Sequence, residues 1–263
     1  IGQSFETTYE MFQGKDPRFL ASIYVPGSSL LGSTMQFQRG LILKDGSKYY
    51  AQSAPGPSYL LETYIDPETQ RKDTIFGKDG GTYTGDASKT GFNIRKFVNE
   101  NLKTEAQWDF GKTETSFPIF RLAEVYLNLA EAAVEMGKYQ TEAFEAIKKI
   151  RDRAGVVTPF AVVDVEKVRH ERQVELAFEG HRFWDMKRWR IAHLPVDQGG
   201  LNGFRGAGLH PFFDLRIRKY VFEVANDLPK RQRVFTEKNY YTKFSGNDMN
   251  SNPSLIQNPE FLN

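Results

Sequence analysis

Four acidic side chains recur near helical spacing between residues 171 and 185, and they are the first candidates for chemistry. They are Glu171, Glu175, Glu179 and Asp185. Glycoside hydrolases use two carboxylates about 5 to 9.5 Å apart. Here, however, five Lys or Arg residues are interleaved with the four carboxylates between positions 171 and 190. Because buried charges persist only when they are paired, we interpret the segment as a structural ion network and regard a hydrolase as the less favoured hypothesis.

The expected partners of the carboxylates are basic residues on the same helical block. We expect Glu175 and Glu179 to pair with Arg172, with Arg182, or with the arginines of the two preceding helices.

Two weak metal-site patterns occur, and neither is complete. The segment HERQV, which starts at His170, lacks the second histidine of the HExxH zinc motif. Asp248, Asn250 and Asn252 resemble the start of a calcium loop, but the turn glycine is missing and Pro259 stands at position 12. The chain has no cysteine, which excludes thiolate ligands, disulfides and a Cys nucleophile. We predict no metal and no cofactor.

Three helical patterns must position the charges. Apolar residues recur at three- and four-residue spacing from 118 to 136, and Gly137 is placed to end that helix. A second helix is predicted to start near Thr141, acidic at its beginning and basic at its end, as the helix dipole favours. A third starts at Asp164, with a kink or close contact expected at Gly180. The first two have the lengths of one tetratricopeptide unit, which cannot bury both of its faces alone.

The remaining segments predict β-structure and loops. Asp45 and Gly46 separate two β-prone runs in residues 41–50, which predicts a hairpin. A short strand is expected at 19–25, after a turn at Asp16 and Pro17. Residues 51–115 are expected to form ordered loops that carry aromatic side chains, because they are rich in Gly, Pro, Ser, Thr and Tyr. The Pro-punctuated tail after Asn252 cannot be a continuous helix.

The overall composition is that of a globular protein with a substantial core. The 263 residues are 40% hydrophobic, and 35 Lys and Arg balance 33 Asp and Glu to a formal charge of +2. No whole-chain field therefore favours nucleic acid or an anionic membrane surface. No apolar run approaches the roughly 20 residues of a membrane helix, and the start IGQSFETTYE has neither a basic region nor an apolar signal core.

Six segments, in this order, resemble the SusD/RagB family of surface lipoproteins that serve nutrient uptake in Bacteroidetes. They are DPRF (16–19), GFNIRKF (91–97), FPIFRLAEVYLNLAEA (117–132), IRDRAG (150–155), ERQVELAFEGHRFWDMKRW (171–189) and NPSLIQNPEF (252–261). No single segment is decisive, but their ordered occurrence across nearly the whole chain is highly specific.

The resemblance implies a mainly α fold, an α/α superhelix with one tetratricopeptide-like helix pair, joined to a loop-rich region with short β-hairpins. It also implies a non-catalytic protein that captures glycans or other oligomeric nutrients over a SusC-type TonB-dependent transporter at the outer-membrane surface. Family members usually carry about as much chain again on the N-terminal side, including the lipidated cysteine that anchors them, so this sequence resembles their C-terminal portion. Residues 220–245 depart from the family's usual apolar, Pro-rich strand.

Within this family's function, aromatic side chains on loops are the expected ligand contacts. Sugar rings stack on aromatic faces, and nearby polar groups bond the hydroxyls. Trp108 is the first candidate, and it can equally pack on the protein's own core. Trp184 and Trp189 lie inside a helical pattern and are expected to be structural. The full set of expected contacts is Trp108, Tyr59, Tyr64 and Tyr83 for stacking, with Gln107, Asp109 and Lys112 for hydrogen bonds.

The expected organisation is one SusD-like C-terminal domain with three parts. Residues 1–116 form a loop-rich ligand-side part, 117–194 the helical core, and 195–263 a loop-rich tail. The leading hypothesis is surface binding of glycans or other oligomeric nutrients, with the transporter as protein partner. The alternative is a tetratricopeptide-like interaction module without a ligand site of its own.

Overall fold

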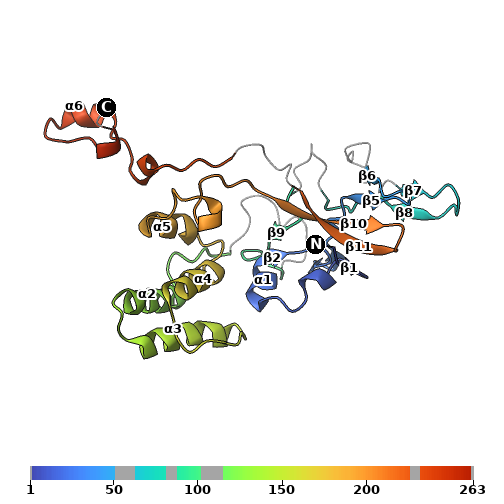
Figure 1. Cartoon of the computed structure of the whole chain (residues 1–263), viewed down its shortest axis with the longest axis horizontal. Coiled ribbons are helices and arrows are strands. Elements are labelled where there is room, and N and C mark those ends of the chain that lie inside the picture. Colours follow the sequence, from blue (N-terminus) through green and yellow to red (C-terminus); the bar gives the residue numbers. More distant parts are fainter. Residues whose placement is uncertain (1, 51–62, 81–87, 102–114, 226–231, 262–263) are drawn as a thin grey trace. The chain divides into compact units, whose positions relative to one another are not determined.

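The computed structural model describes residues 2–50, 63–80, 88–101, 115–225 and 232–261 (Figure 1). The chain divides into two compact units. The first comprises Ile1–Glu179 and Ala207–Leu228, and it contains a helical block and a five-stranded sheet. The second comprises Gly180–Gly206 and Pro229–Asn263.

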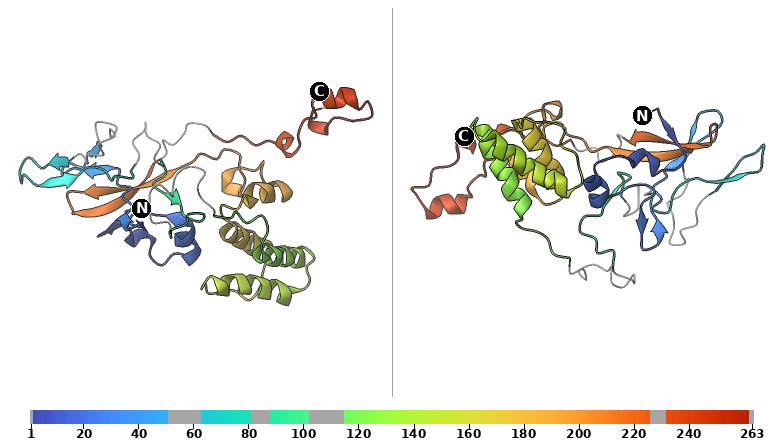
Figure 2. Two further views of the ribbon diagram at one scale, coloured as in Figure 1. Left: turned by 180° about the vertical axis from the view of Figure 1, so that it is seen from behind. Right: turned by 90° about the horizontal axis from the view of Figure 1, so that it is seen from below.

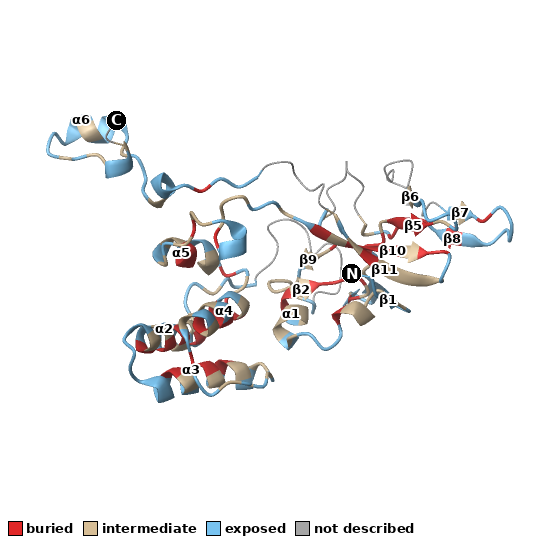
Figure 3. Cartoon of the chain, in the orientation of Figure 1, coloured by how far each residue is buried: buried red, intermediate tan, exposed pale blue. Residues whose placement is uncertain are grey.

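Three helices of the first unit form the helical block. They are α2 (Leu122–Glu135), α3 (Gln140–Arg153) and α4 (Val165–Glu175). They lie side by side, and their buried residues line the facing sides (Figures 2 and 3). Leu127 and Ala130 of α2 and Ala143 and Ile147 of α3 are buried in one cluster. Small side chains at several of these positions let the backbones approach closely. The packing of α2 against α3 confirms the predicted helix pair.

Glycines end both helices of the pair, as predicted. Gly137 and Gly155 have φ values of 63° and 68°. The next residue in each case, Lys138 or Val156, donates its N–H back to a carbonyl in the last turn of the helix. The start of α2 differs from the prediction, because the helix begins at Leu122 instead of Pro118. α3 begins at Gln140, next to Thr141 as predicted, but its N-cap is Tyr139 and not Thr141.

One side of α2 remains uncovered by the described residues. Leu122, Val125, Leu129 and Met136 are 63%, 41%, 46% and 58% exposed, and they recur at spacings of three, four and seven residues. We call these four residues the outer α2 row. Their spacing places them on one face of the helix, away from the buried residues. The helix is therefore apolar on two sides, as a lone helix pair predicts.

The predicted third helix is broken. α4 begins after Asp164, whose carboxylate accepts a hydrogen bond from the backbone N–H of Lys167 at 2.9 Å. It ends at Glu175, and α5 (His181–Arg188) follows as a separate helix. Phe178 and Gly180 between them have φ values of 66° and 81°. A left-handed backbone cannot continue an α-helix, so the expected kink is a full break.

The first unit also contains a sheet with the strand order β1-β11-β10-β5-β6. Its strands are β1 (Ser4–Phe5), β5 (Gly40–Ile42), β6 (Lys48–Tyr50), β10 (Gly208–Asp214) and β11 (Lys219–Ala225). The pair β5 and β6 is the predicted hairpin, with Gly46 at φ 86° in its turn. β10 pairs antiparallel with β11 and parallel with β5. The expected mainly α class therefore describes the helical block but omits this sheet.

Three two-stranded ladders accompany the sheet. β2 (Ile23–Tyr24) pairs with β9 (Asn93–Ile94), β3 (Ser29–Leu30) with β4 (Ser33–Thr34), and β7 (Thr63–Ile65) with β8 (Lys72–Thr74).

The strand expected at 19–25 is wrong for most of its length. Residues Pro17–Ser22 form helix α1, and β2 covers only Ile23–Tyr24. The reason is local, because the Asp16 carboxylate accepts from the backbone N–H of Arg18 at 2.9 Å and Pro17 occupies the first helical position. Both features favour a helix start.

The second unit is built around α5 and a small aromatic cluster. The ring of Phe235 lies 6.2 Å from that of Phe183 and 5.1 Å from that of Tyr240. The guanidinium of Arg190 stacks 4.5 Å from the Tyr240 ring. Its helices after residue 229 are short: α6 (Gly246–Ser251) and the 3₁₀ turns Glu237–Tyr240 and Pro259–Phe261. The tail after Asn252 is thus discontinuous, as predicted. Among all described residues, no helix has the length and apolar character needed to span a membrane.

Candidate functional site

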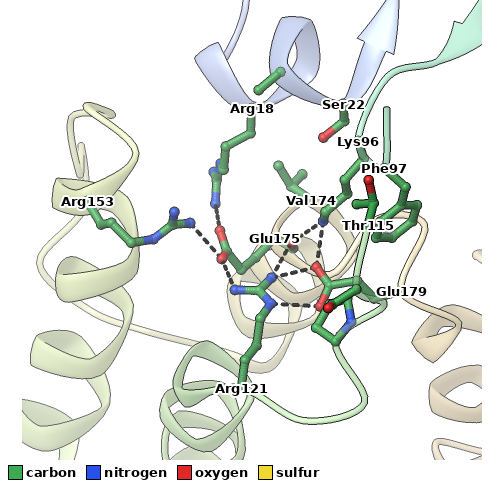
Figure 4. A pocket seen from close by; sticks show the side chains of 13 residues that line it. Arg18, Ser22, Lys96, Phe97, Thr115, Arg121, Arg153, Val174, Glu175 and Glu179 are labelled. Carbon is green, nitrogen blue, oxygen red and sulfur yellow. Dashed lines mark hydrogen bonds and ion pairs between the residues drawn. The ribbon is translucent and has the colours of Figure 1, made fainter. Parts of the chain in front are cut away.

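A group of arginines and one lysine surrounds the carboxylates of α4 and the turn after it (Figure 4). Glu175, whose side chain is 1% exposed, accepts from three arginines that come from different segments. Arg121, just before α2, donates to Oε1 at 2.6 Å, and Arg153 at the end of α3 donates to the same oxygen at 2.7 Å. Arg18 of α1 donates to Oε2 at 3.1 Å. This one carboxylate thus joins four segments of the first unit.

Glu179 is held in the same way. Arg121 donates to both of its oxygens, at 2.7 and 2.8 Å, and Lys96 donates to Oε1 at 2.5 Å. Lys96 also donates to the carbonyl of Ala177 at 2.8 Å. Burial alone would raise the pKa of the Glu179 carboxyl, but the hydrogen bonds and charges of Arg121 and Lys96 outweigh burial and lower it. Glu179 is therefore a carboxylate at neutral pH.

Glu171 completes the network. Its two oxygens accept from Arg18 at 2.5 Å and from Arg151 at 2.7 Å. Arg18 also donates two hydrogen bonds to the carboxylate of Asp16, from Nε at 3.0 Å and from Nη2 at 2.7 Å. The hydrogen bonds from Arg18 are the main reason that the pKa of Asp16 lies below its ordinary value. Arg172 donates to Asn128 at 2.8 Å.

The network lines a hollow of about 370 Å³, with Phe97, Pro118 and Val174 among its apolar walls. Its carboxylates accept from the cations around them, and Glu179 is held ionised, so it cannot serve as a general acid at neutral pH. This supports the structural interpretation of the network. In the described ranges, no group of His, Cys, Asp and Glu residues could hold a metal ion.

The predicted ion pairs are confirmed in part. The arginines of the first two helices, Arg121 and Arg153, do bind Glu175. The two largest omissions are Arg18 and Lys96, which lie 153 to 157 and 83 residues from their carboxylate partners. No local periodicity in their segments, DPRF and FNIRKF, connects them with α4.

A second concave surface lies on one face of the sheet and is lined by aromatic and charged side chains. We call it the Tyr50 hollow; its volume is about 160 Å³, and it is lined by Arg39, Lys48, Tyr50, Phe212, Glu223, Val224 and Ala225. Tyr50 is 40% exposed, and its ring meets that of buried Phe212 edge-on at 5.8 Å. The guanidinium of Arg39 lies 6.0 Å from the Tyr50 ring centre, and Lys48 forms an ion pair with Glu223.

Strand register explains why these groups meet. Tyr50, Gly40 and Phe212 are consecutive partners across β6, β5 and β10, so they share one face of the sheet. Gly40 leaves room between the two rings. A Cβ there would lie 3.2 Å from the Phe212 ring and 2.5 Å from the carbonyl oxygen of Tyr49. The lack of a side chain at Gly40 therefore sets the spacing of this aromatic surface.

Of the predicted ligand contacts, Tyr64 falls among the described residues. It lies in β7, its ring is 5.5 Å from that of Tyr49, and it packs against the buried cluster that contains Leu41 and Ile75. The predicted contacts that lie outside the described residues are Tyr59, Tyr83, Gln107, Trp108, Asp109 and Lys112.

Tyr50 was not among the predicted contacts, although the sequence contained a signal for it. Period-2 alternation in the predicted hairpin places adjacent Tyr49 and Tyr50 on opposite faces. The structure shows Tyr49 packed on the core and Tyr50 exposed.

The first unit combines a helix pair, a sheet, an internal ion network and a concave aromatic surface. These features define a protein of mixed helical and β-structure. A family model described as "SusD family" matches residues 2–261, and the chain belongs to this family.

Individual relatives match over shorter lengths. SusD-like protein P2 of Formosa agariphila is 31% identical over 101 residues, which cover 34% of this chain and 20% of that protein. SusD-like protein P25 of the same organism is 39% identical over 80 residues, covering 28% of this chain and 15% of that protein. The aligned segments thus span a fifth or less of these curated relatives.

Two solved structures are similar over most of this chain. One is a SusD-like carbohydrate binding protein from Bacteroides fragilis, at 28% identity and a TM-score of 0.47, covering 71% of this chain and 31% of that one. The other is surface glycan-binding protein A from Bacteroides uniformis, at 20% identity and a TM-score of 0.44, covering 75% of this chain and 36% of that one.

Proposed function

We propose that this chain is part of a cell-surface protein that binds glycans without catalysing a reaction and delivers them to a SusC-type TonB-dependent transporter. Membership in the SusD family supports the class. The structural observation that carries the proposal is the Tyr50 hollow, in which an exposed ring stands among hydrogen-bonding groups.

The chemistry of the Tyr50 hollow suits a sugar ring. The apolar face of a sugar stacks on an aromatic ring, and its hydroxyls need donors and acceptors at the rim. Tyr50 supplies the ring, Arg39 and Lys48 supply donors, and Glu223 supplies an acceptor. The edge-on contact with Phe212 fixes the ring before a ligand arrives, which reduces the entropy lost on binding.

The ligand contacts expected from the sequence belong to the same proposal. Trp108, with Tyr59, Tyr64 and Tyr83, would add stacking surfaces, and Gln107, Asp109 and Lys112 would bond hydroxyls. Of these, Tyr64 contributes least, because its ring is already packed against Tyr49.

The proposed location is the outer face of the outer membrane, through a lipid anchor outside these 263 residues. The transporter is the proposed protein partner, and no cofactor is required. If the transporter failed to co-purify with an anchored full-length protein, this part of the proposal would be contradicted.

Affinity electrophoresis of the full chain in gels that contain individual polysaccharides tests the binding function. A polysaccharide that slows the migration of the wild-type protein should slow Tyr50→Ala less, because the aromatic ring on which the sugar stacks is lost. Tyr139→Ala is the matched control, since Tyr139 is also exposed but precedes α3. Uniform lack of retardation across starch, plant and host glycans, or equal effects of the two substitutions, would contradict the proposal.

The outer α2 row favours a second candidate function, a tetratricopeptide-like protein-interaction module. Four exposed apolar side chains at helical spacing can receive a partner helix. A partner captured through this row should remain bound when glycan is washed away and should be lost in Leu129→Glu. Retention of the partner by Leu129→Glu would count against this function.

A further inference from the structure

A third concave surface differs from the other two in the chemistry of its lining. It measures about 290 Å³ and lies between the connector from β4 to β5, the end of β8, and β11. We call it the Tyr220 hollow. Its lining residues are Thr8, Thr34, Met35, Gln36, Phe37, Gln38, Thr74, Gly77 and Tyr220. None of these nine residues carries a charge at neutral pH.

The walls of the Tyr220 hollow are held together by hydrogen bonds to backbone carbonyls. Gln38 is buried, and its side-chain amide donates to the carbonyls of Thr74 and Ile75 at 2.7 and 3.0 Å. Gly77 donates its N–H to the carbonyl of Gln38 at 2.9 Å. A Cβ at Gly77 would lie 2.0 Å from the carbonyl oxygen of Gln36, so only glycine permits this approach. These hydrogen bonds therefore fix the shape of the hollow in the absence of a ligand.

Several polar side chains in this hollow have no hydrogen-bond partner among the described residues. They are the hydroxyls of Thr8, Thr34, Thr74 and Tyr220 and the side-chain amide of Gln36. In the hollow beside α4, by contrast, the charged groups bond one another. Burial raises the pKa of Tyr220, so its hydroxyl is a neutral donor and acceptor at physiological pH.

The Tyr220 hollow and the Tyr50 hollow lie on opposite faces of one sheet. Val221 pairs with Phe212, which is in register with Gly40 and Tyr50. Tyr220 is the next residue along β11, and its side chain therefore points to the other face. Its ring lies 5.1 Å from that of Phe213, on the same face. A substitution at Tyr220 can thus leave the Tyr50 surface intact.

We propose that the Tyr220 hollow is a binding site for a single neutral sugar residue, separate from the Tyr50 hollow. The volume lies at the lower limit of small-molecule sites, which typically run from about 300 Å³ upward. Uncharged hydroxyls and an amide match the hydroxyls of a neutral sugar, while the lining offers no cation for an acidic one. The inference rests on the proposed glycan-binding function and adds to it the charge class of one bound unit.

Saturation-transfer NMR on the full chain tests this site with neutral methyl glycosides of glucose, galactose, mannose and xylose, and with glucuronate as the acidic comparison. We expect saturation transfer to at least one neutral glycoside and a weaker signal for glucuronate. Tyr220→Phe removes one hydroxyl and should weaken the neutral glycoside roughly 2- to 10-fold, the range for one hydrogen bond.

Tyr49→Phe is the matched control. Tyr49 is also half-buried on this sheet against an aromatic neighbour, but it lies outside the hollow lining. It should leave the affinity unchanged. Gln36→Ala, at an exposed side chain, should weaken binding in the same sense as Tyr220→Phe and provides a second variant if the first unfolds.

The outcomes separate this inference from the proposed function. Absence of saturation transfer to every neutral glycoside, or equal affinities for wild type, Tyr220→Phe and Gln36→Ala, overturns the Tyr220 site. If polysaccharide retardation still depends on Tyr50 in that case, the proposed function stands without it. If no polysaccharide is retarded but a neutral glycoside binds through Tyr220, the site stands and the polysaccharide function fails.

Discussion

Arg18 and Glu171 are separated by 153 residues in the chain, yet Nη1 of the arginine lies 2.5 Å from Oε1 of the glutamate. Both side chains are largely buried, at 10% and 2% exposure. The contact joins α1 to α4 and belongs to a network that includes Glu175 and Glu179. Since buried charges are costly when they lose a partner, removing one member of this network should strongly destabilise the helical block.

Arg18 and Glu171 should be energetically coupled. Arg18→Met and Glu171→Gln should each lower the free energy of unfolding, because each removes one partner from a buried ion pair. The double variant should cost less than the sum of the two, by about 0.5 to 3 kcal/mol. Urea unfolding of the four proteins measures this coupling. Additive losses would show that the two side chains contribute independently.

Glu175→Ala should be among the most destabilising substitutions in the chain. It leaves Arg18 and Arg121 without a shared carboxylate, and the expected loss is about 3 to 5 kcal/mol in the free energy of unfolding. Lys148→Ala is the control, since its pair with Asp152 on α3 is exposed and should contribute little. If the denaturant midpoints of the two variants fell equally, the network would not be the main structural support that we propose.

Stability should fall in acid, and Lys96 should set part of that dependence. The pKa of Glu179 is lowered in the folded state from an ordinary value of 4.5, so its contribution is complete above that pH and is lost as the pH falls through the lowered pKa. Lys96→Met removes one cation beside Glu179 and should bring the pKa of Glu179 back toward 4.5. The variant should therefore be less stable than wild type at neutral pH, and the difference should shrink in acid.

Unfolding free energies measured from neutral pH to below 4.5 test the role of Lys96. Lys138→Met provides the control, because Lys138 is exposed in the turn between α2 and α3. A constant difference between wild type and Lys96→Met across this range would mean that Lys96 does not act on the Glu179 titration.

Gly40→Ala should disturb the sheet and the Tyr50 hollow together. The added methyl group would collide with the carbonyl of Tyr49 and crowd the ring of Phe212, and overpacking of this kind costs about 1 to 3 kcal/mol. Polysaccharide retardation should weaken in parallel with thermal stability. Gly206→Ala, where an added Cβ meets nothing within 4 Å, should change neither. Normal stability and retardation in Gly40→Ala would contradict the proposed spacing role.

The locally determined elements could be predicted from the sequence. Spacing along α2 and α3, with Gly137 and Gly155 as terminators, identified the helix pair. Asp45 and Gly46 identified the hairpin of β5 and β6. α1 also carries a local signal, because Asp16 is a capping residue and Pro17 a first-turn residue, and they outweigh the β-prone residues that follow them.

Long-range relationships could not be predicted. Nothing in the local pattern of Gly40 states that β5 lies parallel to β10, some 170 residues later in the chain. In the same way, Arg18 and Lys96 carry no periodic signal that connects them with Glu175 and Glu179. The Tyr50 surface depends on that sheet pairing, since Phe212 reaches Tyr50 across Gly40.

The position of Glu175 in the chain implies an order of assembly. Its three arginine partners, Arg18, Arg121 and Arg153, all precede it. During synthesis, α2 and α3 can pack as soon as residue 153 has emerged, because their contacts are local. The three arginines, however, have no Glu175 to bind until α4 has been synthesised. Bringing Arg18 and Glu175 together closes a long chain segment and is slow compared with forming the helix pair. α4 is thus the segment whose synthesis allows α1, the start of α2 and the end of α3 to be joined through one carboxylate.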